Sequence, residues 1–179
     1  MNEGVQMPNN PTYPAAPDTG TSGPPEKMRD LEFFLGHWNA PGVFHETPFG
    51  PRKPILMQID GASKHRGHWI TLETAELPTP DNPTPLTARY IWGYDQTTDE
   101  FVADWYDSNG GRGIQRSTGW ASDQLVFLGT ITMNGTTVPL RDTFTRHGPD
   151  AYHHIGEIDL GSRWIAVDEE DAVRTVGGA

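Results

Sequence analysis

The chain has 179 residues, enough for one domain with a sizeable core, and its 20 glycines and 16 prolines favour short strands joined by many turns. A formal net charge of −11 argues against a nucleic acid or an anionic membrane surface as partner, and the lack of cysteine excludes disulfides, thiolate catalysis and cysteine-ligated metal centres. The sequence has no long apolar run and no basic-then-apolar N-terminal segment, so we expect a cytoplasmic protein without a membrane span.

The first 26 residues differ in composition from the rest of the chain. They hold six of the 16 prolines, and Tyr13 is their only aromatic residue. Such a segment cannot bury enough apolar surface to offset the entropy lost on ordering. We therefore predict a disordered or draped tail over residues 1–26 and a single folded domain over residues 27–179.

One short helix is expected at the start of the folded domain. Within residues 27–35, Met28, Leu31, Phe34 and Leu35 recur at a helical spacing and share one face. Gly36 follows directly and is a natural end for the helix.

The remainder of the chain has the pattern of an all-β protein. Alternating segments are separated by turn residues at a spacing of about ten, and Asn134-Gly135 is a strong hairpin dipeptide. The pattern predicts an antiparallel up-and-down closed barrel of about nine to ten strands, with the short helix plugging one end, because closure removes exposed sheet edges. The strands are expected at residues 37–46, 55–59, 67–76, 87–94, 100–107, 114–120, 124–132, 137–146, 151–158 and 163–174.

Two parts of the sequence resemble known barrel proteins. The FFLGHW segment at residues 33–38 resembles the opening of calycin-type barrels, in which a short helix precedes a Gly-x-Trp strand start. The WGYD segment at residues 92–95 and the FVADWYDSNG segment at residues 101–110 resemble the DUF1579 family. The resemblance covers roughly residues 31–174 and implies a lipocalin-like barrel with a central cavity, but it implies no particular activity. It also implies a structural pair, in which the Arg174 guanidinium stacks on Trp38.

Aromatic and polar residues on the strands are the candidates for the cavity wall. A lipocalin-like cavity is mostly apolar with a few placed polar groups. Arg141 has an equally good alternative, which is to face solvent together with Thr143 and Thr145. The residues that we expect to line the lumen and bind a ligand are Tyr90, Trp92, Trp105, Tyr106, Arg141 and His154.

No motif in the sequence identifies a catalytic residue or a metal site. His153 and His154 are neighbours on one strand and point to opposite faces, so they cannot easily share an ion. We expect no metal and no cofactor, with a haem held by His154 or His68 as an alternative. The acidic run at residues 168–171 is interpreted as a solvated strand end.

Three functions are compatible with these features. The first is a carrier or sensor that binds an apolar or aromatic small molecule in an almost wholly apolar lumen. The second is a cofactor-independent cyclase, isomerase or pericyclase, which would need a buried cluster of polar groups in the lumen. The third is a structural or interaction protein, whose lumen would be filled by side chains. The expected partner is a small hydrophobic molecule. The sequence is also compatible with a homodimer.

Overall fold

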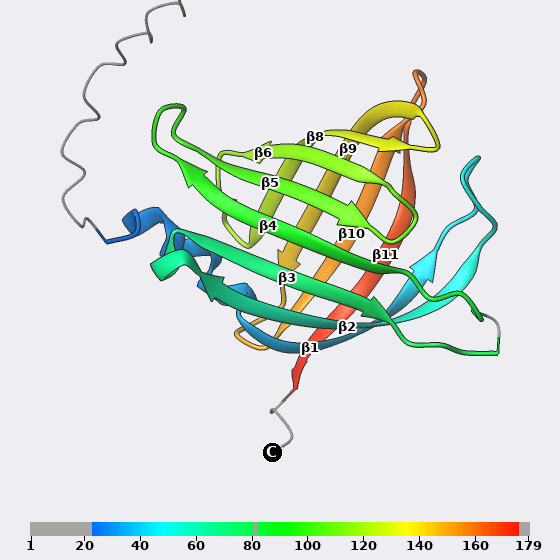
Figure 1. Cartoon of the computed structure of the whole chain (residues 1–179), viewed down its shortest axis with the longest axis horizontal. Helices are drawn as coiled ribbons and strands as arrows, with labels where there is room; N and C mark the ends of the chain where they lie inside the picture. Colours follow the sequence, from blue (N-terminus) through cyan, green and yellow to red (C-terminus); the bar gives the residue numbers. More distant parts are fainter. Residues whose placement is uncertain (1–22, 81, 176–179) are drawn as a thin grey trace, which may run out of the picture.

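The computed structural model describes residues 23–80 and 82–175 and contains one sheet of eleven strands (Figure 1). Most of the predicted tail, residues 1–22, lies outside the described residues. No helix among the described residues is long and apolar enough to cross a bilayer. The elements are η1 (Glu26–Phe34), β1 (Gly36–Phe44), β2 (Lys53–Lys64), η2 (His65–Gly67), β3 (Trp69–Glu76), β4 (Thr87–Asp95), β5 (Glu100–Asp107), β6 (Arg112–Ser117), β7 (Trp120–Ala121), β8 (Gln124–Met133), β9 (Thr136–Arg146), β10 (Ala151–Asp159) and β11 (Trp164–Thr175).

The sheet closes on itself. Strands that follow one another in the chain pair antiparallel, except that β6 pairs directly with β8 and not with the short β7, and β1 also pairs with β11. Strand β7 has two residues and pairs with β8, so ten strands form the closed ring. The predicted antiparallel up-and-down barrel of nine to ten strands is therefore confirmed. Within the described ranges, closure leaves no long edge strand with unpaired backbone groups.

The predicted N-terminal helix is present as the 3₁₀ helix η1. Its residues Met28, Leu31 and Phe34 are buried, as the helical spacing indicated. The helix lies against one end of the barrel, next to β3 and β4 (Figure 1). Its apolar face therefore covers that end and joins the core.

An aromatic core fills the end of the barrel that η1 covers. The Phe34 ring packs against the rings of Trp92, Trp120, Phe144 and Tyr152, with centroids 4.9–5.8 Å apart. Aromatic side chains of this size contribute a large buried area each, and their edge-to-face contacts add to it. This end of the barrel is consequently filled by side chains.

Arg174, near the end of β11, ties the helix to the barrel. Its guanidinium lies 4.1 Å from the centroid of the Trp38 ring, which is buried. The same group donates to the carbonyl oxygens of Leu35 and Phe33 and to the Asp150 carboxylate. One side chain therefore links the end of η1, the first strand and the turn between β9 and β10.

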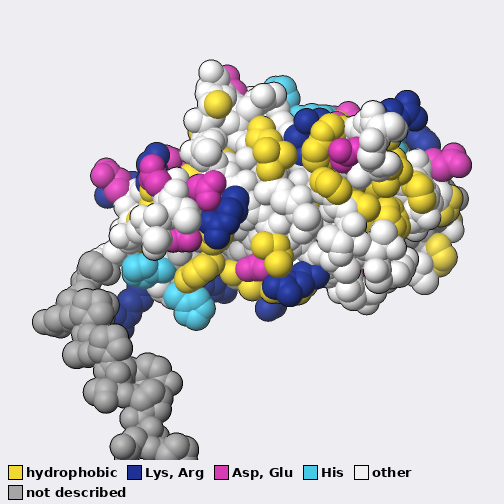
Figure 2. All heavy atoms as spheres, turned by 90° about the horizontal axis from the view of Figure 1, so that it is seen from above, with side chains coloured by type: hydrophobic (Ala, Val, Ile, Leu, Met, Phe, Trp, Pro, Cys, Tyr) yellow, Lys and Arg dark blue, Asp and Glu magenta, His cyan; other side chains and the backbone are white. Residues whose placement is uncertain are grey.

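The outer surface of the barrel is mixed in character. Ile114 on β6 and Leu128 on β8 are exposed large apolar residues. On the face shown in Figure 2, hydrophobic side chains occur beside acidic and basic ones. Scattered exposed apolar residues of this kind are normal for a folded protein.

Candidate functional site

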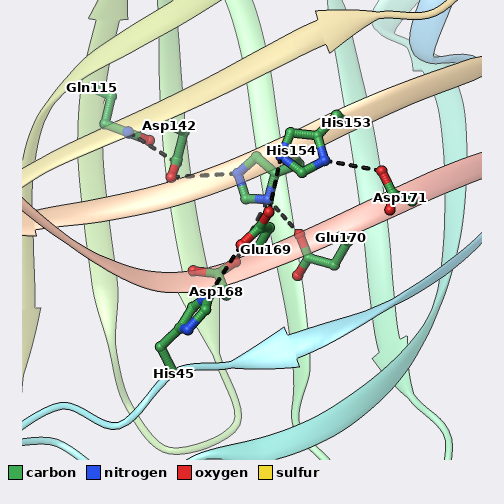
Figure 3. Close-up of polar contacts among 9 residues, drawn as sticks. All are labelled: His45, Gln115, Asp142, His153, His154, Asp168, Glu169, Glu170 and Asp171. Carbon is green, nitrogen blue, oxygen red and sulfur yellow. Dashed lines mark hydrogen bonds and ion pairs between the residues drawn. The ribbon is translucent and has the colours of Figure 1, made fainter.

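Strands β9, β10 and β11 bring four ionisable side chains together inside the barrel. Because side chains alternate along a strand, Asp142 on β9, His154 on β10, and Asp168 and Glu170 on β11 all point inward (Figure 3). His154 is directly opposite Glu170 in the pairing of β10 with β11. We call these four residues the lumen cluster.

Gly156 on β10 makes room for two of the carboxyl groups. It is paired with Asp142 on one side and with Asp168 on the other, so it lies between them in the sheet. A Cβ atom at this position would overlap Oδ1 of Asp168 and would lie 3.2 Å from Oδ1 of Asp142. The glycine therefore allows the two carboxyl groups to approach each other across β10.

His154 is the centre of the lumen cluster. Its Nδ1 lies 2.6 Å from Oε2 of Glu170 and 3.6 Å from Oδ2 of Asp168, and its Nε2 lies 3.5 Å from Oδ1 of Asp142. The distance to Asp142 is too long for a good hydrogen bond, and Nε2 has no hydrogen-bond partner in the part of the chain that the structure describes. The imidazole ring stacks on Phe144 with centroids 4.5 Å apart, which fixes its orientation.

A side chain from β6, which is separated from β9 by β8 alone, holds Asp142. The amide nitrogen of Gln115, on β6, donates to Oδ2 of Asp142 over 2.9 Å. Both residues are buried. This bond fixes the carboxylate in place and satisfies one of its two oxygens, and the other oxygen faces His154.

The carboxyl groups and burial shift the pKa values in the cluster. Burial by itself lowers the pKa of His154, but the charge of Glu170, the nearby carboxylate of Asp142, the bond to Glu170 and the charge of Asp168 outweigh it and raise that pKa well above 6.5. Burial and the neighbouring Glu170 raise the pKa of Asp168 well above 3.8. Burial, followed by the charge of Asp142, also raises the pKa of Tyr90. His154 and Asp168 therefore both favour their protonated forms.

The lumen cluster lies on the wall of a cavity of about 520 Å³ inside the barrel. This volume falls within the range of small-molecule sites, roughly 300–1,000 Å³. The rest of the wall is largely apolar and aromatic. It includes Phe44, Phe49, Met57, Ile59, Leu72, Tyr90, Trp105, Ile131, Leu140, Phe144 and Ile158.

The cavity extends towards the end of the barrel that η1 does not cover. Its lining includes residues 44–45, 47 and 49–53, which join β1 to β2, and residues 82–84 and 86, which precede β4 (Figure 1). At this end the buried carboxylate of Glu76 accepts bonds from Lys53 over 3.0 Å and from the backbone nitrogen of Leu86 over 2.8 Å, and it also bonds Asn82. These bonds hold the two connecting segments together at what we call the mouth.

Three of the residues expected in the lumen line the cavity. They are Tyr90, Trp105 and His154. Trp92 also points inward, but it lies in the aromatic core at the closed end, where its ring packs 4.9 Å from both Phe34 and Phe127. Trp92 therefore packs in the aromatic core beneath η1 and is not among the residues that line the cavity.

Two other expected lumen residues point away from the cavity. Tyr106 follows the inward Trp105 on β5 and is 41% exposed. Arg141 lies between the inward Leu140 and Asp142, so it faces outward, where it binds Glu157 over 2.7 Å and stacks on Trp164. Side chains alternate along a strand, so Tyr106 and Arg141 face outward instead of into the lumen as expected. For Arg141, the alternative of facing solvent is the one observed.

The interpretation of residues 168–171 as a solvated strand end is wrong. Glu169 and Asp171 do point outward, but Asp168 and Glu170 face the lumen. Asp142 is similarly an acidic residue on an otherwise apolar face of β9. An alternating pattern with Ala172 on the same face as Glu170 is the signal that indicates an inward position.

The lumen cluster offers groups that could hold an ion or a cofactor. Ligand atoms of His154, Asp168 and Glu170 lie within 4.8 Å of one another, a spacing that could accommodate a metal ion. For a haem, Nδ1 of His154 is bonded to Glu170 and Nε2 faces Asp142, so iron would have to displace a carboxylate. His68, the other haem candidate, is not among the residues that line the cavity.

Fold and site together define a closed antiparallel β-barrel with an internal cavity and a buried acid–histidine cluster. Among solved structures, the chain is similar to the crystal structure of Rv2717c from M. tuberculosis, with a TM-score of 0.68 and 14% sequence identity. The match covers 86% of this chain and 99% of that chain. At this identity the similarity shows the fold alone. No protein-family model and no curated protein matches the chain, so membership of the DUF1579 family stays a prediction.

Proposed function

We propose that the barrel binds a small, largely apolar or aromatic molecule in its lumen, as a carrier or a sensor. The observation that supports this function is the cavity of about 520 Å³, which has an apolar and aromatic wall and one polar cluster. This combination is typical of small-molecule sites, where apolar surface provides affinity and a few polar groups fix orientation. A lipocalin-like relationship would be consistent with the same function.

The cavity also distinguishes among the three functions that the sequence left open. A purely structural barrel would have a lumen filled by side chains, and the cavity argues against it. A carrier of wholly apolar molecules would not need the buried Asp142, His154 and Glu170, because burying such groups costs free energy unless they are used or paired. The expected ligand is therefore amphipathic, with a polar end at the lumen cluster.

Blocking the cavity is expected to abolish binding of an apolar probe. Leu140 lines the cavity and is buried, so Leu140→Trp places an indole in the space that a ligand would occupy. We expect its affinity for N-phenyl-1-naphthylamine, measured by the fluorescence of the probe, to fall by about tenfold or more. Leu128→Trp, on the exposed face of β8, is the matched control and should bind like the wild type. Equal binding by both variants would contradict a site in the lumen.

A second candidate function is cofactor-independent catalysis in the same cavity. His154 is flanked by Glu170 and Asp142 at the cavity wall, an arrangement that can hold a proton donor or acceptor against a substrate. The ligand that co-purifies from the native host would be identified by native mass spectrometry and then incubated with fresh protein. A cyclase or isomerase would change its chromatographic retention at constant mass, and His154→Gln would stop the change while binding persists. An unchanged ligand leaves the carrier function.

A further inference from the structure

We propose that the lumen ligand carries a basic nitrogen, and that its ammonium group binds the carboxyl groups of Asp142, Asp168 and Glu170. This inference rests on the proposed lumen binding and names the chemical class of the ligand, an amine with an apolar or aromatic body. The carboxyl groups are supplied by two strands, β9 and β11, and all three line the cavity (Figure 3).

Acidic groups outnumber basic ones in the cluster. Three carboxyl groups face a single imidazole. With Asp168 in its protonated form, a charged His154 balances only one of the other two, Asp142 and Glu170. The other basic residues of the cavity wall lie among residues 45–53, near the mouth. His45 pairs with Glu169, Lys53 is bound to Glu76, and Arg52 is exposed. Among the described residues, none of these three basic groups pairs with the cluster.

The cluster is also short of hydrogen-bond donors. Among the described residues, only Gln115 and His154 donate from other side chains to its carboxyl groups. A protonated imidazole donates through both ring nitrogens, and Nε2 of the buried His154 points towards Asp142 from 3.5 Å. The carboxyl oxygens that neither Gln115 nor His154 reaches are acceptors, and buried acceptors are normally paired with donors. An ammonium carries three such donors.

Glu76 shows how the same fold satisfies a buried carboxylate. It has the side chains of Lys53 and Asn82 and a backbone N–H of Leu86 around it, and its charge is balanced by the lysine. The lumen cluster has more carboxyl groups, and no lysine or arginine within residues 23–80 and 82–175 is bound to it. The difference between the two sites is a cation, which the ligand would supply.

The cavity wall determines the rest of the ligand. The aromatic rings of Tyr90, Trp105 and Phe144 line the same cavity as the acidic groups. Aromatic faces attract cations as well as apolar rings. A carboxylic acid, such as a fatty acid, would place a second negative charge against Glu170 and is disfavoured. An apolar or aromatic amine satisfies both parts of the cavity.

Three naphthalene derivatives that differ in one group test the inference. Each carries a short arm, which ends in an ammonium, a hydroxyl or a carboxylate. Isothermal titration calorimetry at pH 7 with EDTA present, to exclude bridging by trace metals, gives the three dissociation constants. We expect the ammonium compound to bind about tenfold tighter than the alcohol or better, because hydrogen bonds to charged groups contribute more than neutral ones, and the carboxylate to bind weakest.

Charge-removing variants assign the preference to the cluster. In Glu170→Gln the ratio of the affinities for the ammonium and the alcohol should fall by about tenfold. Asp171→Asn is the matched control, because it removes a charge from the next residue of β11, whose side chain is 79% exposed. Asp142→Asn, which keeps the volume of the side chain, replaces Glu170→Gln if that variant fails to fold.

The outcomes separate this inference from the proposed function. Equal affinity for the three compounds overturns the preference for an amine and leaves lumen binding in place. Binding of none of them, together with no binding of the apolar probe, overturns lumen binding itself. An ammonium preference that persists in both Glu170→Gln and Asp142→Asn would show that the cation binds elsewhere and would also overturn the inference.

Discussion

Asp168→Asn is expected to make the protein more stable at pH 8 than the wild type, by about 1 kcal/mol or more. Burial and the neighbouring Glu170 raise the pKa of Asp168, so the folded protein favours the protonated acid. In the unfolded chain, the Asp168 carboxyl group loses its proton at an ordinary acidic pH. Folding at pH 8 must therefore either protonate this group again or bury its charge. Asparagine has nearly the shape of the protonated acid and has no proton to recover.

The sign of the effect follows from the direction of the shift. A raised pKa stabilises the folded state fully below the unfolded value, 3.8 for Asp168 and 6.5 for His154. This stabilisation is lost as the pH rises through the folded value. Both groups therefore make the free energy of unfolding fall as the pH rises above these unfolded values, with a slope of up to about 1.4 kcal/mol per pH unit for each proton. The charged groups that face them are Asp142 on β9 and Glu170 on β11, and Tyr90 on β4 faces the same cluster.

Urea denaturation at several pH values measures this effect. The difference in free energy of unfolding between Asp168→Asn and the wild type should be largest near pH 8 and should shrink towards pH 5. Asp171→Asn removes an exposed carboxylate from the same strand and should show no such trend. A loss of stability in Asp168→Asn at pH 8 would mean that Asp168 is ionised in the folded protein.

Gly61→Ala is expected to destabilise the protein by about 3 kcal/mol, because it forces the helix η1 away from the barrel. Gly61 on β2 lies under the end of η1, and a Cβ atom there would overlap the carbonyl oxygen of Phe34. That oxygen also accepts a hydrogen bond from Nε1 of Trp38 over 3.2 Å. Since backbone atoms are involved, no change of side-chain rotamer can relieve the overlap.

Gly50→Ala is the matched control for this substitution. A Cβ atom at Gly50, in the segment that joins β1 to β2, would meet nothing within 4 Å. Chemical denaturation should show a large loss of free energy of unfolding for Gly61→Ala and almost none for Gly50→Ala. Similar stability in both would show that η1 does not need this close approach.

The architecture was predictable because its signals are local. Alternation and turn residues indicated the strands, and Asn134-Gly135, where both residues have positive φ values, forms the predicted hairpin between β8 and β9. Strand limits were less predictable. Strand β2 runs from Lys53 to Lys64 instead of over residues 55–59, because its pairing with β1 and β3 extends it through Gly61-Ala62-Ser63, which has little apolar alternation.

The candidate site was only partly predictable because it depends on register between distant strands. His154 was expected in the lumen from its own strand, but its partners lie on β9 and β11. A shift of one residue in the pairing would place Glu169 and Asp171 inside and Glu170 outside. Alternation with Ala172 indicates which face of β11 points inward, but no local feature of the sequence fixes which residues of β9 and β10 lie beside that face. Gly156, which makes the close approach of two carboxyl groups feasible, has no signature of its own.

The plugged end also has a consequence for the order of events when one ligand replaces another. Because η1 and the aromatic core fill one end, the cavity communicates with solvent through the mouth at the other. A second molecule cannot push the first out from behind, so the bound ligand must leave before its competitor enters. The rate of release in a chase experiment should then be independent of the competitor concentration, and it should depend on opening of the segments that Lys53 and Glu76 hold together.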